Sequence, residues 1–237
     1  MATLAQVEVS DQSFWQKTML WISVFIVFGF AQFAARGLVD YGSVPLYVHA
    51  HAVVMMAWLG LTVTQATLVA RDNLALHRRL GWLGAALATV VVCFGSWVSI
   101  QIIQAHREPF FFTPPFFLAL TQVGLLTFAG LIVAAIARRK ETEWHRRLMV
   151  GALIMLMEPA LGRTLPMPLI MPWGEWAALV VQLGVLAVVA RHDRKVLGMI
   201  HPATIAAGLV ITLSHCIIEA LAVAPFWQAL TDRVIAA

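Results

Sequence analysis

The chain has 237 residues, of which 61% are hydrophobic and only 12% charged, and its mean hydropathy is +0.83. An ordinary soluble domain carries roughly 25% charged residues, and a soluble fold of this length cannot bury so much apolar surface. The apolar runs are long and continuous, which excludes a disordered chain and differs from the alternation of β-barrel strands. We therefore predict an all-α, polytopic membrane helix bundle.

Seven apolar runs are long enough, or nearly so, to cross a hydrocarbon core of about 30 Å, which takes about 20 residues. They are residues 18–36, 46–70, 79–103, 115–137, 148–165, 174–190 and 202–222. Glu158, Pro159 and Arg163 interrupt the fifth run. A membrane tolerates a broken helix only where protein or a polar cavity receives the freed backbone groups, so we expect an internal polar site near this run.

The basic residues orient the bundle. The seven spans place 12 of the 16 Lys and Arg residues on the same side of the membrane as the N-terminus. The four on the opposite side are Arg36, Arg107, Arg163 and Arg233. The positive-inside rule then predicts an N-in, C-out topology: a cytoplasmic segment over 1–17, one transmembrane bundle over 18–222 and an external tail over 223–237. Basic loops that face anionic lipid also explain the pI of 9.6, so we expect membrane lipid and no nucleic acid as partner. The expected location is a bacterial inner membrane.

Two similar loops indicate an internal duplication. LHRRLGWLGAAL begins at Leu76 and WHRRLMVGALIM at Trp144, so each opens a helix with His-Arg-Arg-Leu and a glycine follows within two turns. We predict that spans 2–3 and 4–5 form a duplicated helical hairpin, with His77 and His145 equivalent. Two such histidines can ligate one metal or haem, with arginines neutralising the haem propionates. The alternative is a cation cluster at the membrane surface that only fixes topology.

Several of these features resemble known families. His51 at the start of the second span, Gln65 within it, the two His-Arg-Arg-Leu openings and an arginine in the fifth span are similar to a group of uncharacterised bacterial polytopic membrane proteins. That likeness covers residues 46–165 and implies no activity. LHRRLG also resembles a helix-opening motif of transmembrane di-haem b-type cytochromes, in which a histidine after leucine ligates haem. This second resemblance implies that His77 is a haem ligand.

Ionisable groups within spans cost roughly 2.5–3.5 kcal/mol each, so they are candidates for function. The rise per helical residue places five of them at similar depth in the outer half: His51, Glu158, Arg163, His215 and Glu219. We predict that they line one polar cavity, although a buried ion-pair network that only holds helices together is the alternative. His51 and His215 are the expected ligand pair, because their depths differ by about 2 Å.

A metal in this cavity needs three or four ligands, which His49, His51, His215 and Glu219 can supply. Haem b instead needs one histidine from each of two facing helices. The remaining histidines are expected in solvated loops: His106, His192 and His201.

The leading hypothesis is an integral membrane protein that binds haem b or a transition metal in the outer half of the bundle. Glu158 and Glu219 would handle protons and Arg163 an anionic group, in a redox protein or oxidoreductase acting on quinol or another lipid-phase substrate. One alternative is a proton-coupled small-molecule transporter, which the hairpin repeat and the broken fifth span favour. Another is a non-catalytic membrane subunit or assembly factor of a larger complex, which the short loops favour.

Overall fold

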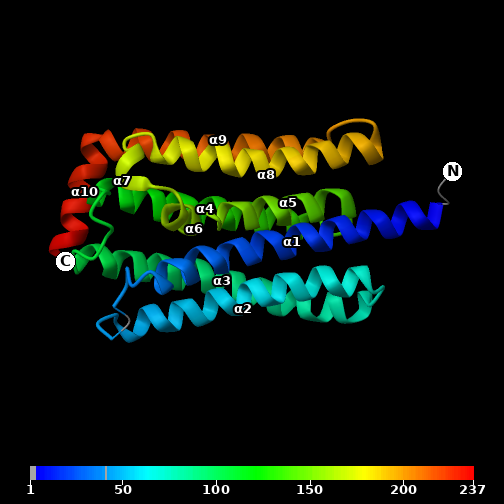
Figure 1. The fold of residues 1–237 in the computed structure, drawn as a ribbon, viewed down its shortest axis with the longest axis horizontal. Helices are drawn as coiled ribbons and strands as arrows, with labels where there is room; N and C mark the ends of the chain where they lie inside the picture. The colour runs from blue at the N-terminus through cyan, green and yellow to red at the C-terminus, as the bar shows by residue number, and fades with distance from the viewer. Residues whose placement is uncertain (1–3, 41) are drawn as a thin grey trace.

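The computed structural model describes residues 4–40 and 42–237, and in that part of the chain it contains helices and turns but no strand. The helices are α1 (Leu4–Ala35), α2 (Leu46–Ala70), α3 (Leu74–Gln104), α4 (Pro114–Ala137), α5 (Thr142–Met155), α6 (Glu158–Thr164), α7 (Met167–Ile170), α8 (Gly174–Leu197), α9 (Pro202–Val223) and α10 (Pro225–Ala236). The long helices lie side by side in one bundle, and α10 runs across its end (Figure 1). The predicted all-α class is confirmed.

Six helices of the described chain are long and apolar enough to cross a membrane: α1 from Asp11, α2, α3, α4, α8 and α9. Their outward faces are apolar too, since Trp21 is 66%, Leu126 68% and Leu209 66% exposed. A surface of this kind suits hydrocarbon better than water, because apolar side chains that face lipid incur no hydration penalty. The fold therefore fits a helical membrane bundle.

The fifth predicted run, 148–165, is divided between two short helices. Helix α5 ends at Met155, and α6 begins at Glu158 with Pro159 in its first turn. Proline lacks a backbone N–H, and its ring clashes with the carbonyl four residues earlier, which here belongs to Met155. Of the seven predicted spans, six thus correspond to continuous helices of the described chain, and the fifth corresponds to the broken pair α5 and α6. The break places Glu158 at the start of a helix inside the bundle.

Close helix contacts hold the broken segment in place. A Cβ atom added at Gly29 of α1 would lie 2.8 Å from the Cβ atom of Ala160 in α6. One added at Gly151 of α5 would lie 2.9 Å from the Cβ atom of Ala207 in α9. Only glycine permits these approaches without a shift of the backbone, so both positions fix where α5 and α6 sit.

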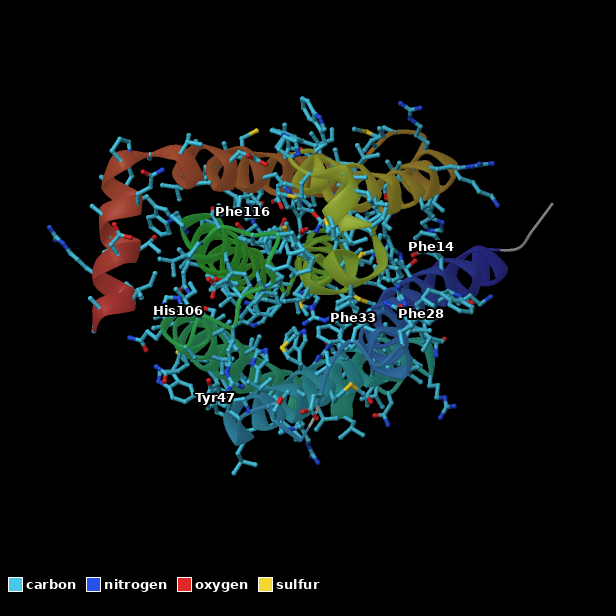
Figure 2. The ribbon with its side chains drawn as sticks, turned by 60° about the vertical axis from the view of Figure 1, so that its left-hand side comes forward. Phe14, Phe28, Phe33, Tyr47, His106 and Phe116 are labelled. Carbon is cyan, nitrogen blue, oxygen red and sulfur yellow. The ribbon has the colours of Figure 1, made fainter. Side chains whose placement is uncertain are left out.

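The two predicted terminal segments are helical. Residues 4–17 continue α1, so the segment predicted over 1–17 is not separate from the first helix in its described part. Residues 225–236 form α10, which packs against the bundle end in Figures 1 and 2. Trp227 Nε1 donates a hydrogen bond to the carbonyl of Pro115 at 2.9 Å. The region predicted as a tail is therefore docked, because its aromatic side chain is bonded to the start of α4.

The two ends of the bundle differ. Helix α1 begins at the end that carries the α2–α3 and α8–α9 turns, and the basic residues of these turns gather there (Figure 1). We call this the basic end. Helices α7 and α10 lie at the opposite end, which we call the α10 end.

Candidate functional site

A cluster of buried polar side chains lies where α6, α8 and α9 meet, toward the α10 end. Glu158 begins α6, Glu175 is the second residue of α8, and His215 lies in α9. These three residues each offer one ligand atom, and the three atoms lie within 4.8 Å of one another. His215 is 0% exposed and Glu175 is 3% exposed. The structure thus assembles a buried set of groups that can bind a metal.

Gln182 connects two members of this cluster. Its Nε2 donates to Oε2 of Glu158 at 2.8 Å, and its Oε1 lies 2.9 Å from Nε2 of His215. An amide oxygen can only accept, so Nε2 of His215 carries the hydrogen. In the neutral imidazole the other nitrogen, Nδ1, then presents a lone pair. Gln182 therefore selects the tautomer of His215 and turns Nδ1 toward a different partner.

That partner is Glu175. Nδ1 of His215 lies 2.6 Å from Oε1 of Glu175, yet neither atom takes part in a hydrogen bond with any described residue. Two lone pairs repel at this distance unless a cation, either a proton or a metal ion, interacts with both. At 2.6 Å the two atoms are close enough to share a proton. Ligand atoms about 2.0–2.2 Å from one ion and at right angles to each other lie about 3 Å apart, so a metal ion between the pair needs the two side chains to separate by a few tenths of an ångström.

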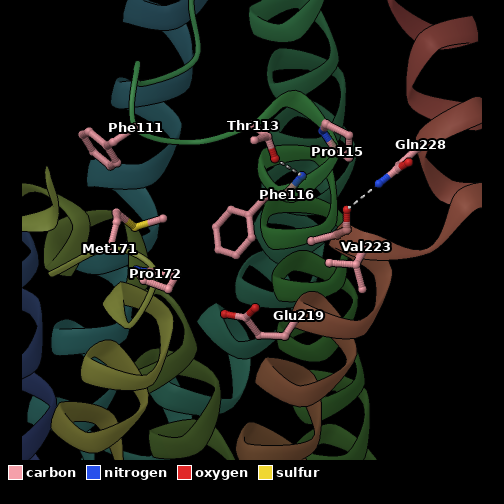
Figure 3. Close-up of a pocket in the computed structure, with 10 residues that line it drawn as sticks. Phe111, Thr113, Pro115, Phe116, Met171, Pro172, Glu219, Val223 and Gln228 are labelled. Carbon is pink, nitrogen blue, oxygen red and sulfur yellow. Dashed lines mark hydrogen bonds between the residues drawn. The ribbon is translucent and has the colours of Figure 1, made fainter.

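A pocket of about 410 Å³ opens beside the cluster at the α10 end (Figure 3). Glu219 reaches into it from α9, one turn beyond His215, and interacts electrostatically with both Glu175 and His215. The other lining residues are apolar or neutral: Phe111, Thr113, Pro115, Phe116, Met171, Pro172, Ala222, Val223 and Gln228. An apolar molecule that enters this pocket meets a carboxylate close to the buried cluster.

The structure divides the five residues that we expected in one cavity. Glu158, His215 and Glu219 are brought together as described, but His51 packs against α3 and α4. Its ring lies 5.9 Å from that of Phe94, and its Cε1 and the side chain of Leu125 both lie 3.4 Å from the position of a Cβ atom on Gly95. No contact among the described residues joins His51 to His215.

Arg163 and His49 also lie outside the cluster. The guanidinium of Arg163 stacks over Phe30 of α1 at 4.1 Å and donates a hydrogen bond to the carbonyl of Pro159 at 2.7 Å. Arg163 therefore faces α1 rather than the carboxylates. His49 lies in the first turn of α2 and is no member of the ligand group found among the described residues. Of the four metal ligands predicted from sequence, His215 belongs to the observed group and Glu219 lies near it. The other two, His49 and His51 of α2, are not members of that group.

The basic end contains a second polar cluster, which sequence analysis placed at the membrane surface. Arg147 is 1% exposed, and its Nη2 lies 2.5 Å from Oδ1 of Asp193. Asp11 lies 2.5 Å from Arg146 and 2.7 Å from His192. His192 is thus a helix residue inside an ion-pair network, and the expectation of a solvated loop is wrong. These arginines bind carboxylates of other helices because the ends of α1, α5 and α8 pack together there.

His77 and His145 are brought together at the basic end. Their ring centroids lie 6.4 Å apart, although 68 positions separate the two residues in the sequence. Each opens the second helix of a hairpin, α3 or α5. This pair is distinct from the Glu158–Glu175–His215 cluster, which lies toward the α10 end.

Sequence analysis missed Glu175 and Gln182. Glu175 lies at the edge of a predicted span. A carboxylate there costs little free energy, so its presence does not by itself indicate a functional site. Gln182 is neutral and was not considered among the ionisable groups. Its place seven residues after Glu175, two turns along one helix face, is the signal that could have linked them.

Comparisons of this chain with protein-family models, with curated proteins and with solved structures return no match.

Proposed function

We propose that this chain is an integral membrane metalloprotein that binds one transition-metal ion through Glu158, Glu175 and His215. The observation that carries the proposal is the pair of buried acceptors, Nδ1 of His215 and Oε1 of Glu175, which lie 2.6 Å apart without a hydrogen bond to a described residue. A bound cation resolves the repulsion between them. It also offsets the cost of burying more carboxylates than the single imidazole can neutralise.

The ligand set indicates the metal class. Carboxylate oxygens with one imidazole nitrogen suit Mn²⁺, Fe²⁺ or Zn²⁺ better than soft, thiolate-seeking ions. Three protein ligands also leave a coordination position open for water or substrate, as catalytic sites do. Haem is a poorer fit here than a bare ion, because both nitrogens of His215 already face protein groups, Gln182 and Glu175.

The neighbouring pocket suggests what the metal acts on. Its apolar walls favour a lipid-phase molecule, and Glu219 is placed to accept a proton from a polar group of that molecule. A quinol, or another lipid with a hydroxyl group, combines these properties. We therefore propose metal-dependent chemistry. With a redox-active ion, Mn or Fe, its leading form is oxidoreductase action on a quinol-like substrate, in which the ion would pass the two electrons of the quinol to a separate electron acceptor and Glu219 would take a proton.

The proposed orientation is N-in, C-out, in a bacterial inner membrane. The support is the concentration of basic residues at one end of the bundle, which the positive-inside rule places in the cytoplasm. The cluster then lies in the outer half. Reporter fusions should read cytoplasmic after Arg71, Lys140 and Lys195 and external near His106 and at the C-terminus. A cytoplasmic C-terminus would contradict this topology.

Elemental analysis of the purified full chain tests the metal proposal. We expect about one equivalent of Mn, Fe or Zn in the wild type after supply of these metals, and a loss of that equivalent in Glu175→Gln and in His215→Gln. The matched control is Glu141→Gln, because the Glu141 side chain is 52% exposed and pairs with Arg138 at the surface. A wild type that retains no metal above the level of the two cluster variants would refute the proposal.

A proton-coupled transporter is the second candidate. The specific observation is the connected series from Glu158 through Gln182 to His215 and Glu175, in which a proton can serve as the missing cation. The series begins at a broken helix, as the midplane sites of many carriers do. This candidate predicts a metal-free protein in which Glu175→Gln abolishes proton-driven uptake into vesicles.

A further inference from the structure

The paired histidines of the basic end have no role in the proposed metal site. His77 of α3 and His145 of α5 face each other with ring centroids 6.4 Å apart and ring planes at 85°. They come from two different hairpins, α2–α3 and α4–α5, and both lie at the first turn of the second helix. Their meeting point is therefore created by the packing of one hairpin on the other.

Each hairpin holds its histidine in the same way. Nδ1 of His77 lies 3.3 Å from the carbonyl oxygen of Gln65 in α2, and Nδ1 of His145 lies 2.8 Å from the carbonyl oxygen of Ala135 in α4. A carbonyl only accepts, so each Nδ1 carries the hydrogen. The neutral ring then has its lone pair on Nε2, and a backbone contact of this kind is how ligand histidines are oriented in metal sites.

The spacing of the rings matches two ligands on opposite sides of one metal. With metal–nitrogen bonds of about 2 Å, and each ring centre about 1.2 Å behind its nitrogen, two trans imidazoles have centres roughly 6.4 Å apart. The hydrogen bonds that the two rings make to described residues run through Nδ1, so the Nε2 lone pair of each neutral ring is not used by them.

The surroundings are polar. Gln65, whose backbone carbonyl holds His77, also donates from Nε2 to the carbonyl of His77 at 3.2 Å. Its side-chain oxygen, Oε1, is buried and accepts no hydrogen bond from a described residue. A buried acceptor without a donor can be satisfied by a water molecule, including one that is bound to a metal ion. Arg78 and Arg79 follow His77 on the exposed surface and can neutralise an anionic ligand.

We propose that His77 and His145 bind one metal centre between their Nε2 atoms, as trans ligands. This site goes beyond the proposed Glu158–Glu175–His215 site and lies at the other end of the bundle. Two kinds of metal centre can use a pair of imidazole ligands in this way: haem iron and a bare metal ion. Haem iron supplies four ligands of its own and needs two axial imidazoles, whereas a bare Cu or Zn ion adds water to complete its coordination.

Titration of the purified full chain in detergent with haemin, and separately with Cu²⁺ and with Zn²⁺, tests the proposal. Saturation by haemin at one equivalent, with the six-coordinate low-spin spectrum of two axial imidazoles, supports it with haem as the source. The two ion titrations use Glu175→Gln, in which the proposed Glu158–Glu175–His215 site lacks a ligand. Saturation of this variant by one equivalent of Cu²⁺ or Zn²⁺ that needs both histidines supports the proposal with a bare ion as the source. Saturation by neither ion, together with no saturation by haemin, would overturn it.

Variants assign the ligands. We expect His77→Asn and His145→Asn each to lower the affinity at least tenfold, or to change the haemin spectrum from low-spin to high-spin. His201→Asn is the matched control, because His201 lies at the same end and caps α9 with Nδ1, a role that asparagine also performs well. Binding by both variants as tight as that of the control would overturn the assignment. Glu175→Gln should leave this binding unchanged, which separates the site from the proposed function.

Discussion

The bundle contains two buried polar clusters, one at each end, and they differ in how their charges are balanced. At the basic end, Arg147 contacts Asp193 and Glu143, and Arg146 contacts Asp11. Toward the α10 end, three carboxylates surround one imidazole. In the first cluster each of the three carboxylates contacts an arginine, whereas in the second Glu158 and Glu175 both lie against the imidazole of His215.

Hydrogen bonding separates the two clusters in the same way. Asp193 is 0% exposed, and besides Arg147 it accepts hydrogen bonds from Thr204 at 2.6 Å and from the backbone N–H of His201 at 3.1 Å. At the other cluster, Glu175 and His215 leave buried acceptors unpaired. A carboxylate such as Asp193, whose hydrogen bonds are complete, stabilises helix packing and needs no ligand, whereas the unpaired acceptors of Glu175 and His215 point to a missing cation. The comparison therefore assigns a structural role to the Arg147–Asp193 pair and a binding role to the Glu158–Glu175–His215 cluster.

The largest predicted effect is at the basic end. Arg147→Met leaves the buried Asp193 without its cation, and such a loss costs about 3–5 kcal/mol of folding free energy. We expect an early unfolding transition of this variant in mixed detergent micelles, followed by near-UV circular dichroism.

The double variant Arg147→Met/Asp193→Asn checks the cause. Asparagine keeps an oxygen for Thr204 and for the backbone of His201 but carries no charge. We expect it to recover a large part of the lost stability. A double variant less stable than Arg147→Met alone would show that buried charge is not the reason.

A smaller effect is expected for Gln182→Leu at the α10 end. This change removes the hydrogen bonds to Glu158 and His215 together, and a buried group left unsatisfied costs about 1–3 kcal/mol. The same unfolding assay measures it. Gln182→Glu would sharpen the comparison, because it adds a fourth carboxylate and should destabilise the metal-free protein more than leucine does.

The smallest effect is expected for Glu175→Gln in the metal-free protein. Removal of one of three neighbouring carboxylate charges should leave stability unchanged or raise it by about 1 kcal/mol, because like charges disfavour one another when buried. The quantity to compare is the change in unfolding free energy, which we expect to be a large loss for Arg147→Met and no loss for Glu175→Gln. A loss of several kcal/mol from Glu175→Gln would mean that the cluster is a complete structural network like that of the basic end.

Several of these features could be predicted from sequence, for physical reasons that can be named. Apolar runs of membrane length gave the long helices, and Pro159 marked the break before α6. The repeated His-Arg-Arg-Leu opening pointed to His77 and His145, which the structure brings together. Each of these inferences depends on local backbone chemistry or on a repeat, both of which the sequence contains directly.

The lateral arrangement of the helices could not be predicted. His51 and His215 were paired by depth, but depth along an axis does not say which helices are neighbours or which way each is rotated. Helix α2 is apolar around its circumference, since residues such as Val53 at 69% and Met56 at 52% exposure face outward. A helix of this kind has no polar face to indicate its orientation. Depth alone therefore groups His51 with His215, whereas the structure packs His51 against Phe94 and Gly95 of α3.

The most direct test of the central claim is thermal unfolding of the full chain in detergent with Mn²⁺, Fe²⁺ or Zn²⁺, compared with a chelator. A ligand at one hundred times its dissociation constant stabilises the folded state by about 2.7 kcal/mol. We predict a higher unfolding midpoint with at least one of these metals in the wild type and in His77→Asn, and no increase in the double variant His77→Asn/Glu175→Gln, in which neither proposed site is complete. An equal increase in this double variant and in His77→Asn, or none in His77→Asn with any of the three metals, would contradict the account.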